Sequence, residues 1–437
     1  MNKKINSILN EVLKKIKPSK EEIENIEFFL KKFLKDLNKN IKKSKLDIEI
    51  FIGGSFARGT MINRNKYDVD IFLRFNKKHK NISQLTEKIL TGFKKTKIHG
   101  SRNYFQIKVN PKIILEIIPV VKIKNSKESE NITDLSYFHV NYIKRKLPKK
   151  VLNEVMLAKS FCHANNCYGA ESYIKGFSGY GLELLIYHYK SFLKFVKAIE
   201  KANKDKIIID IEKEFKNKQE ILMNINGSKL QSPIILIDPT HKHRNVLAAL
   251  SEETFEKFQK TCKKFLKNPN LELFELKKID FEKIKENSKK RKLDFILIET
   301  KTNKQKGDIA GSKLLKFHKY LTRGIGNSFY IKNNGFEYND DKSAMQFFIV
   351  KNKKEILFKG PKIKSSKQVQ ASSSKKGERD KKNIKAFKKK HKKTFIKSGR
   401  IYSKEKIRFD IKKFLENWKK KNKRTINEMS ISELEII

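Results

Sequence analysis

Cysteine, tryptophan and proline are scarce in this chain. Its 437 residues include 3 Cys, 1 Trp and 8 Pro. The three cysteines, Cys162, Cys167 and Cys262, are too few and too odd in number for a disulfide framework. Cys162 and Cys167 flank His163, but their spacing matches no zinc motif, and we interpret them as ordinary helix residues. The composition therefore argues against a disulfide-stabilised secreted domain and against a small zinc module.

Long apolar runs are also missing. No stretch approaches the roughly 18 apolar residues of a transmembrane helix. The first residues, MNKKINSILNEVLKK, lack the apolar block of a secretory signal. We therefore expect a cytoplasmic protein that has no membrane partner.

Acidic residues are few relative to basic ones. Lys and Arg number 101 against 48 Asp and Glu, so the formal net charge is +53. Only 12 of the 101 basic residues are Arg, which leaves 89 Lys. An excess of this size attracts polyanions, so nucleic acid is the first partner to test. The alternative is a lysine-biased composition that places Lys at every tolerant surface position.

The length favours roughly three domains of about 150 residues, each able to bury its own core. Residues 1–146 combine helix and strand patterns, residues 147–267 are mostly helical, and residues 268–437 give weaker, alternating signals. We therefore predict an α+β multidomain fold with boundaries near 146 and 267.

The clearest local signals lie in the first segment. After Pro18, residues 19–22 read as a capping box, and apolar residues then recur at helical spacing as far as Leu37. Short runs of β-branched and aromatic residues predict strands at 47–52, 67–75, 104–109 and 113–121.

The last segment is less regular. Strands are predicted at 295–300 and 346–349, with a helix around 312–321. Residues 361–400 are rich in Lys and Ser, and a run of this kind is usually solvated or disordered unless it orders against a phosphate backbone.

Two carboxylates stand two residues apart in Lys66-Tyr-Asp68-Val-Asp70-Ile. On a strand Asp68 and Asp70 share one face, while Val69 and Ile71 point to the core. The like charges repel each other, and without a cation one of the two would tend to take up a proton. A pair of Mg²⁺ ions about 3.5–4 Å apart removes that cost. Taken alone, the pattern equally fits two solvent-facing acids on an edge strand.

The neighbouring segments give this pair a context. Gly53-Gly54-Ser55 ends one strand and opens a turn into a short helix, where backbone N–H groups and the Ser55 hydroxyl can hold a triphosphate. Glu116 lies on the predicted strand at 113–121, on the face of Ile114 and Ile118, where an acid is unexpected unless it has a partner. We predict Glu116 as the third metal-binding carboxylate, and a salt bridge to a lysine is the alternative.

Together these residues resemble the polymerase β-type nucleotidyltransferase superfamily, and later motifs resemble its archaeal, class I CCA-adding tRNA nucleotidyltransferases. The later motifs run from Leu157-Ala-Lys159 to Tyr168-Gly-Ala-Glu171, then through Gly176-Phe-Ser-Gly-Tyr180 with Glu183-Leu-Leu, Ile237-Asp238-Pro239 and Arg244-Asn245-Val246. The resemblance covers residues 45 to 265 and continues more weakly to the end. It implies a nucleotidyltransferase mixed-sheet head at 1–146, a helical central domain of the nucleotide pocket at 147–267, and an α/β body and tail that bind tRNA at 268–437.

The resemblance also implies roles for single residues. Asp68, Asp70 and Glu116 occupy the catalytic Mg²⁺-ligand positions, and Ser55 with Arg58 matches a triphosphate-binding pair. The residues that match those holding CTP or ATP are His139, Lys159 and Tyr168, and the one that matches a base-reading arginine is Arg244. Glu116 departs from the aspartate of known members, and its extra methylene moves the carboxylate by about 1 Å, which the backbone or the metal must absorb.

The implied function is template-independent addition and repair of the 3′-terminal CCA of tRNA from CTP and ATP, with release of pyrophosphate. The implied partners are the acceptor–T stem and 3′ end of tRNA and a second copy of the chain. Two alternatives stay open: a poly(A) polymerase or oligoadenylate synthetase-like enzyme, and a non-catalytic RNA-binding protein. Single matches also stay open, because His139 and Tyr168 could be core residues and Lys159 is one lysine among 89.

Overall fold

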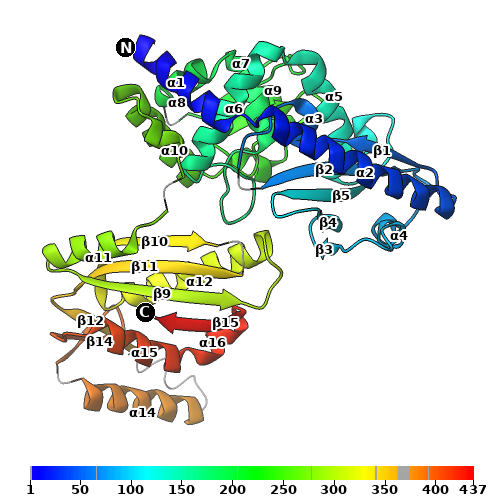
Figure 1. The fold of residues 1–437 in the computed structure, drawn as a ribbon. Helices are drawn as coiled ribbons and strands as arrows, with labels where there is room; N and C mark the ends of the chain where they lie inside the picture. Colours follow the sequence, from blue (N-terminus) through cyan, green and yellow to red (C-terminus); the bar gives the residue numbers. More distant parts are fainter. Residues whose placement is uncertain are drawn as a thin grey trace. The chain divides into compact units, whose positions relative to one another are not determined.

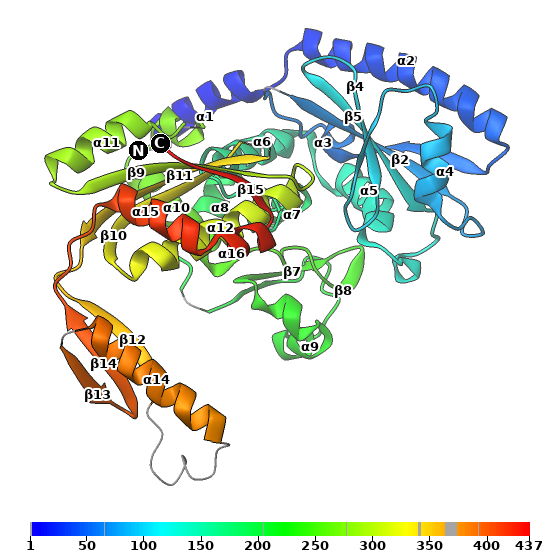
Figure 2. The same cartoon turned by 90° about the horizontal axis from the view of Figure 1, so that it is seen from below.

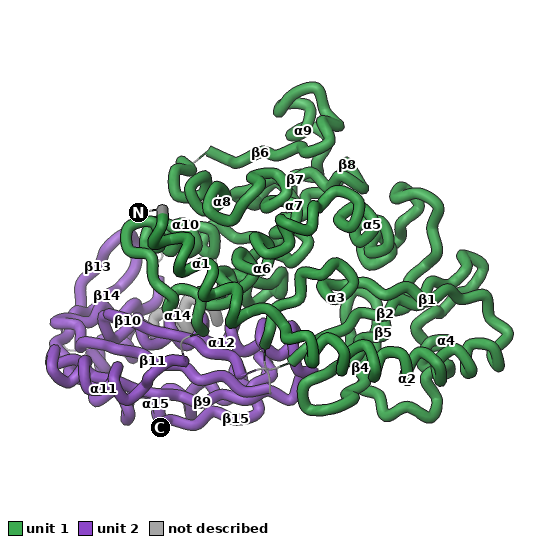
Figure 3. The backbone as a smooth tube through the Cα atoms, turned by 45° about the horizontal axis from the view of Figure 1, so that its top comes forward, with its two compact units in different colours: residues 1–277 green, residues 278–437 purple. Residues whose placement is uncertain are grey.

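The structure is a computed structural model that describes residues 2–64, 66–203, 205–276, 278–339, 342–362, 374–391 and 393–437. The chain forms two compact units, residues 1–277 and 278–437, which Figure 3 draws in different colours. Within the described residues we find sheets of five, four, three and three strands together with many helices. The predicted α+β multidomain class is confirmed.

The elements of unit 1 are labelled in Figure 1. In chain order they are α1 Asn2–Ile16, α2 Lys20–Ser44, β1 Ile48–Ile52, α3 Gly54–Arg58, β2 Tyr67–Phe75, α4 Ile82–Ile89, β3 Thr96–Ile98, β4 Tyr104–Lys108, β5 Ile113–Val121, η1 Ser126–Glu128, η2 Ile132–Leu135, α5 Ser136–Lys146, α6 Lys149–Ala164, α7 Gly179–Tyr189, α8 Phe192–Glu200, β6 Ile207–Ile209, α9 Lys218–Asn224, η3 Gly227–Gln231, β7 Ile234–Asp238, β8 His241–Asn245, α10 Glu252–Lys267 and η4 Leu271–Phe274.

The five-stranded sheet of unit 1 has the order β1-β2-β5-β4-β3. β2 and β5 run parallel, and their register sets Asp70 opposite Glu116. The predicted capping box forms, since the Ser19 hydroxyl accepts from the Glu22 N–H and the Glu22 carboxylate accepts from the Ser19 N–H. α2 then runs along the sheet (Figure 1, Figure 2) and buries its apolar stripe, from Ile26 to Ile41, in a core shared with β2 and β5.

A second core of unit 1 is built from helices. It joins α6, α7, α8 and α10, and it also includes α1, whose Ile5 is fully buried against this group. The small sheet β6-β7-β8 adds to it through Ile234 and Leu236. The N-terminal helix therefore packs with residues that follow it by more than a hundred positions, and the boundaries expected at 146 and 267 stay predictions.

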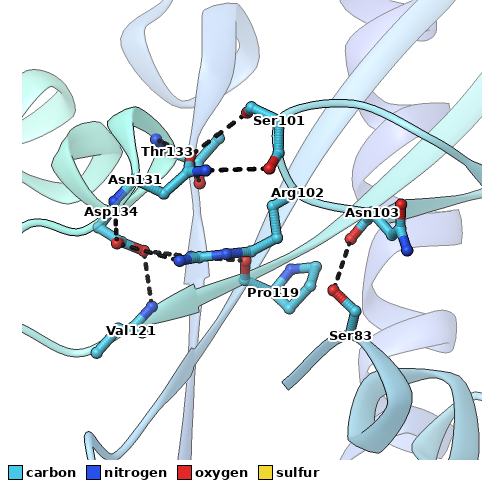
Figure 4. Close-up of polar contacts among 9 residues, drawn as sticks. All are labelled: Ser83, Ser101, Arg102, Asn103, Pro119, Val121, Asn131, Thr133 and Asp134. Carbon is cyan, nitrogen blue, oxygen red and sulfur yellow. Dashed lines mark hydrogen bonds and ion pairs between the residues drawn. The ribbon is translucent and has the colours of Figure 1, made fainter. Parts of the chain in front are cut away.

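One ion pair joins the segment just before β4 to η2 (Figure 4). The Arg102 guanidinium pairs with Asp134, which is 2% exposed. Asp134 also accepts from the backbone N–H groups of Val121 and Asn131, at 2.9 and 3.0 Å. Because every bond of this carboxylate serves the local backbone or its arginine, the pair has a structural role.

Unit 2 has its own core and two sheets. Its elements are α11 Phe281–Lys290, β9 Asp294–Thr302, α12 Asp308–Gly326, β10 Phe329–Tyr338, β11 Ser343–Asn352, β12 Ile356–Lys362, α14 Ser374–Lys390, β13 Thr394–Lys397, β14 Arg400–Glu405, α15 Ile411–Lys421, α16 Lys423–Glu428 and β15 Ile431–Ile436. The four-stranded sheet has the order β10-β11-β9-β15, and the three-stranded sheet has the order β12-β14-β13.

The predictions for this unit meet different outcomes. The predicted strands lie within β9 and β11, and the predicted helix lies within α12. Within the Lys-rich run 361–400, whose order the sequence left open, Ser374–Lys390 form the helix α14, and residues 363–373 and 392 lie outside the described residues. Across the described part of both units, no helix has the length and apolar character that a membrane span needs.

Candidate active site

The β1–α3–β2 segment sets the acidic pair beside a glycine turn. Asp68 and Asp70 lie on the more exposed face of β2, while Val69 and Ile71 between and after them are buried, as the alternation predicted. Gly54 has φ +63°, and a Cβ at this position would lie 1.6 Å from the Asp70 carboxylate oxygen. A residue without a side chain is therefore required for the turn to approach Asp70 so closely.

A pocket of about 460 Å³ opens above this turn. Seven of the nine predicted site residues line it, although they come from α3, β2, α5, α6 and the segment after α6: Ser55, Arg58, Asp68, Asp70, His139, Lys159 and Tyr168. The two others do not line it. The Nη1 atom of Arg244 lies 3.3 Å from Nε2 of the pocket residue His139. Glu116 stands opposite Asp70 in the register of the parallel strands β2 and β5.

Glu116 has a hydrogen-bond partner that the sequence analysis missed. Gln106 on β4 stands opposite it, and the Gln106 Nε2 donates to a Glu116 carboxylate oxygen at 2.8 Å. Burial, and then the charge of Asp70, raises the pKa of Glu116 to about 8. Burial also raises the pKa of Asp70 to about 6, since the Asp68 charge adds to it and Arg58 only partly opposes it. The group of carboxylates is therefore short of positive charge.

The shortage of positive charge beside these carboxylates indicates whether a divalent cation fits the site. Among the described residues no group of three or more His, Cys, Asp or Glu is arranged to hold a metal ion. Asp68 and Asp70 nevertheless bring two carboxylates to one pocket, and hard oxygen donors of this kind suit Mg²⁺. The donor chemistry of this pair fits a divalent cation, and the part of Glu116 in it stays a prediction.

A buried glutamate joins the sheet half and the helical half of unit 1. Glu183 on α7 accepts from Lys159 Nζ at 3.0 Å and from Thr60 Oγ1 at 2.7 Å, and it pairs with Arg58 Nε at 2.8 Å. Burial lowers the pKa of Lys159, and the nearby Arg58 lowers it further, while Glu183 opposes both. Glu183 thus supplies the negative charge that allows two cations to lie buried beside the turn after β1.

A second buried acid, Asp238, accepts hydrogen bonds from several side chains at or beside the pocket. Asp238 at the end of β7 accepts from His139 Nε2 at 3.0 Å, from Arg244 Nη1 at 2.5 Å and from the Tyr180 hydroxyl at 3.1 Å. The rings of His139 and Tyr180 stack with centroids 4.1 Å apart. Burial lowers the pKa of His139, the hydrogen bond and the charge of Asp238 oppose this shift, and the charges of Arg244 and Arg58 add to it.

His163 stacks on Tyr168 in the same pocket, with ring centroids 4.0 Å apart. Burial lowers the pKa of His163 to about 3, and the charges of Arg64 and Lys159 act in the same direction. This ring was interpreted as an ordinary helix residue in the sequence, and the structure places it in the pocket wall.

The sequence held a signal for two of the missed residues. Glu183 is the lone acid in the apolar helix Gly-Tyr-Gly-Leu-Glu-Leu-Leu-Ile, and Asp238 follows four apolar residues of a strand. An isolated acid in such a run needs a buried partner, although the run does not say which one.

Family models match two stretches of unit 1. Residues 153–275 match the second domain of tRNA nucleotidyltransferase. Residues 3–138 match the Second Messenger Oligonucleotide or Dinucleotide Synthetase domain. Together the two matches span both cores of unit 1.

Known proteins are similar over most of the chain. A CCA-adding enzyme of Nanoarchaeum equitans (strain Kin4-M) is 39% identical over 324 residues, which cover 73% of this chain and 75% of the relative. A CCA-adding enzyme of Methanocaldococcus jannaschii is 29% identical over 375 residues, with coverages of 82% and 81%. Among solved structures, a cytoplasmic RNA terminal U-transferase is 15% identical with a TM-score of 0.49, covering 63% of this chain and 100% of that one.

Proposed function

Since the chain belongs to the family of CCA-adding enzymes, we propose that its reaction takes place in the pocket of unit 1. The enzyme adds C, C and A to the 3′ end of tRNA from CTP and ATP without a nucleic-acid template, and releases pyrophosphate. The observation that carries this placement is the convergence of seven predicted residues, distant in sequence, on one pocket.

The carboxylates are the proposed catalytic centre. Asp68 and Asp70 would hold the divalent cations, with Glu116 as the third ligand, and Mg²⁺ is the proposed ion. When bound, such ions neutralise the phosphates and lower the pKa of the attacking 3′-hydroxyl. The raised pKa values of Asp70 and Glu116 support this assignment, because positive charge at this place would relieve the repulsion among the carboxylates.

The turn after β1 is the proposed triphosphate site. The Ser55 hydroxyl would donate to a phosphate oxygen, and the Gly54 backbone allows the close approach. Arg58 engages Glu183 through Nε, so phosphate recognition would use its outer Nη groups. Lys159 would add positive charge from the buried side of the same wall.

The nucleoside would lie against the wall formed by His139, Tyr168 and Arg244. Aromatic and planar groups can stack on a base of either kind, which suits a pocket that accepts both CTP and ATP. The ring nitrogen Nε2 of His139 donates to Asp238, because an ionised carboxylate only accepts. These roles are proposals for the residues that line or border one pocket.

The polyanion partner is tRNA. We propose that basic side chains hold its acceptor–T stem, since A-form helices are recognised largely through phosphates and 2′-hydroxyls. The net charge of +53 supports this proposal. A homodimer and a cytoplasmic location are further expectations, which sedimentation and cell fractionation would test.

Incubation with tRNA that lacks its terminal CCA tests the function directly. With CTP alone we expect two added residues, and with CTP and ATP we expect three and then arrest. A tail that grows with ATP alone would instead indicate a poly(A) polymerase or oligoadenylate synthetase-like enzyme. No incorporation with either nucleotide and Mg²⁺ would leave only an RNA-binding role.

Substitution of the carboxylates tests the site. Asp68→Asn and Asp70→Asn should each lower the rate of incorporation by at least about a hundredfold, since each removes a proposed ligand of the cations that would neutralise the reacting phosphates. Binding of tRNA should stay close to wild type in both variants. Asp36→Asn, at an exposed acid paired with Lys39, is the matched control and should keep full activity.

A further inference from the structure

The carboxylate of Asp238 is fully buried, and the proposed function gives it no role. Its Oδ2 accepts from His139 Nε2 at 3.0 Å and from Arg244 Nη1 at 2.5 Å. Its Oδ1 accepts from the Tyr180 hydroxyl at 3.1 Å and from the Thr240 N–H and hydroxyl at 2.9 and 2.8 Å. Two carboxylate oxygens offer about four lone-pair sites, so these contacts saturate the group. Asp238 therefore has no acceptor left for a substrate.

The donors to Asp238 come from separate elements that meet at the pocket. His139 is on α5, Tyr180 is on α7 and Arg244 is on β8, while Asp238 closes β7. His139 and Tyr180 line the pocket, and Arg244 lies against His139. A single carboxylate thus holds two of the three side chains that the proposed function assigns to the nucleoside, His139 and Arg244.

The bond from His139 also fixes the state of its ring. An ionised carboxylate only accepts, so the ring nitrogen that faces Asp238, Nε2, must carry a proton. In the same way Arg244 is held through one Nη group, which orients the plane of its guanidinium. Without the carboxylate, the histidine could take either tautomer and the arginine could take other rotamers.

We infer that Asp238 is a positioning residue that sets nucleotide affinity by holding His139 and Arg244 at the pocket, without touching the nucleotide itself. This inference rests on the proposed function, because it takes the pocket as the nucleotide site. It assigns to Asp238 the pre-organisation of the binding wall and no part in the transfer step.

Asp238→Asn is the direct test. An amide keeps one acceptor oxygen and replaces the other with a donor, so it cannot accept from both groups of neighbours. We expect the KM for CTP and for ATP to rise about tenfold or more, on the scale of a lost hydrogen bond to a charged group. The kcat at saturating nucleotide should stay within about threefold of wild type, because binding is lost equally in the ground state and the transition state.

Asp134→Asn is the matched control. Asp134 is also buried and paired with an arginine, Arg102, but it does not line the pocket and its other bonds go to backbone N–H groups (Figure 4). This variant should lower the Tm and leave both KM values unchanged. An equal rise of KM in Asp134→Asn and Asp238→Asn would mean general destabilisation and would overturn the inference.

Thr240→Val serves if Asp238→Asn does not fold. It removes one hydroxyl donor from Asp238 and leaves every pocket-lining side chain intact. We expect a smaller rise of KM, about two- to tenfold, with kcat unchanged. If the wild type incorporates CTP and ATP while both variants keep its KM values, the positioning role is wrong and the function stands. A wild type without incorporation contradicts the proposed function itself.

Discussion

Single residues differ in how their buried charges are balanced. Burial alone would raise the pKa of Asp238 and of Glu183, but each acid meets several cationic or donor side chains, and those contacts lower its pKa. Asp70 and Glu116 lack such compensation, and burial leaves their pKa values raised to about 6 and about 8. Strongly shifted groups that lie at a pocket mark a functional site, whereas fully compensated ones mark its supports.

Gly54→Ala should abolish activity with little loss of fold. The added Cβ would overlap the Asp70 carboxylate, so either the turn or Asp70 must move away. Gly92→Ala is the control, since Gly92 also has a positive φ, +88°, but a Cβ there meets nothing within 4 Å. We expect both variants to lose about 1 kcal/mol of stability from backbone strain, and only Gly54→Ala to lose incorporation. Equal activity in the two variants would contradict the assigned close approach.

His163→Phe should make the protein less sensitive to acid. The folded pKa of His163 is about 3, below its unfolded value of about 6.5, so the unfolded state binds a proton that the native state excludes. Stability is therefore present above pH 6.5 and falls as the pH drops toward 3, by at most about 1.4 kcal/mol per pH unit. Phenylalanine keeps the stacked ring on Tyr168 and removes the proton site. Urea unfolding at pH 7 and pH 5 measures the free energy of unfolding of the wild type and of His163→Phe. An equal loss of stability between the two pH values in both proteins would contradict this prediction.

For single residues, the sequence predicted the features that depend only on nearby positions in the chain. Strand alternation correctly placed Asp68 and Asp70 on one face, because the geometry of a strand relates residues two apart. It could not identify Gln106 as the partner of Glu116, or Glu183 as the partner of Lys159. Those contacts depend on strand order and helix packing between distant segments, which local patterns do not encode.

For helices and strands, too, the sequence predicted local features and did not predict contacts between distant segments. The capping box of α2 and the runs of β-branched residues in β1, β2, β4 and β5 were predicted close to their observed bounds, since both signals are local. The parallel pairing of β2 with β5 was not predicted, although it sets Asp70 beside Glu116. The sequence left the order of the Lys-rich run open, because charge repulsion within it argues against a stable element, and the contact of α14 with β12 joins segments that local patterns do not relate.

Glu183→Gln tests the link between the elements of unit 1. The variant keeps the size of the side chain but leaves Arg58 and Lys159 without their buried counter-charge. Breaking a buried pair of this kind costs about 3–5 kcal/mol, so we expect a large drop in the urea midpoint. Glu87→Gln, which breaks a half-exposed pair with Lys97, should change the midpoint little. Equal effects of the two substitutions would show that the pairs around Glu183 add no special stability.

The whole molecule carries a charge that should dominate its encounter with RNA. With a net charge of +53, binding of tRNA should release counterions, so that log K falls linearly and steeply with log salt concentration. Filter binding or fluorescence anisotropy from about 50 to 300 mM salt measures the slope, which is about −0.7 to −0.9 per phosphate neutralised. Affinity that hardly changes over this range would contradict a phosphate-led interface.

The placement of α1 has a consequence for how the protein is made. α1 buries Ile5 against α6 and η4, which the ribosome produces long after it has released α1. At about 10 residues per second, roughly 15 s separate the synthesis of the first helix from that of its partner α6. During that interval the apolar stripe of α1 stays uncovered while the five-stranded sheet can already close. A chaperone that binds before α6 is made would therefore protect the apolar stripe of α1.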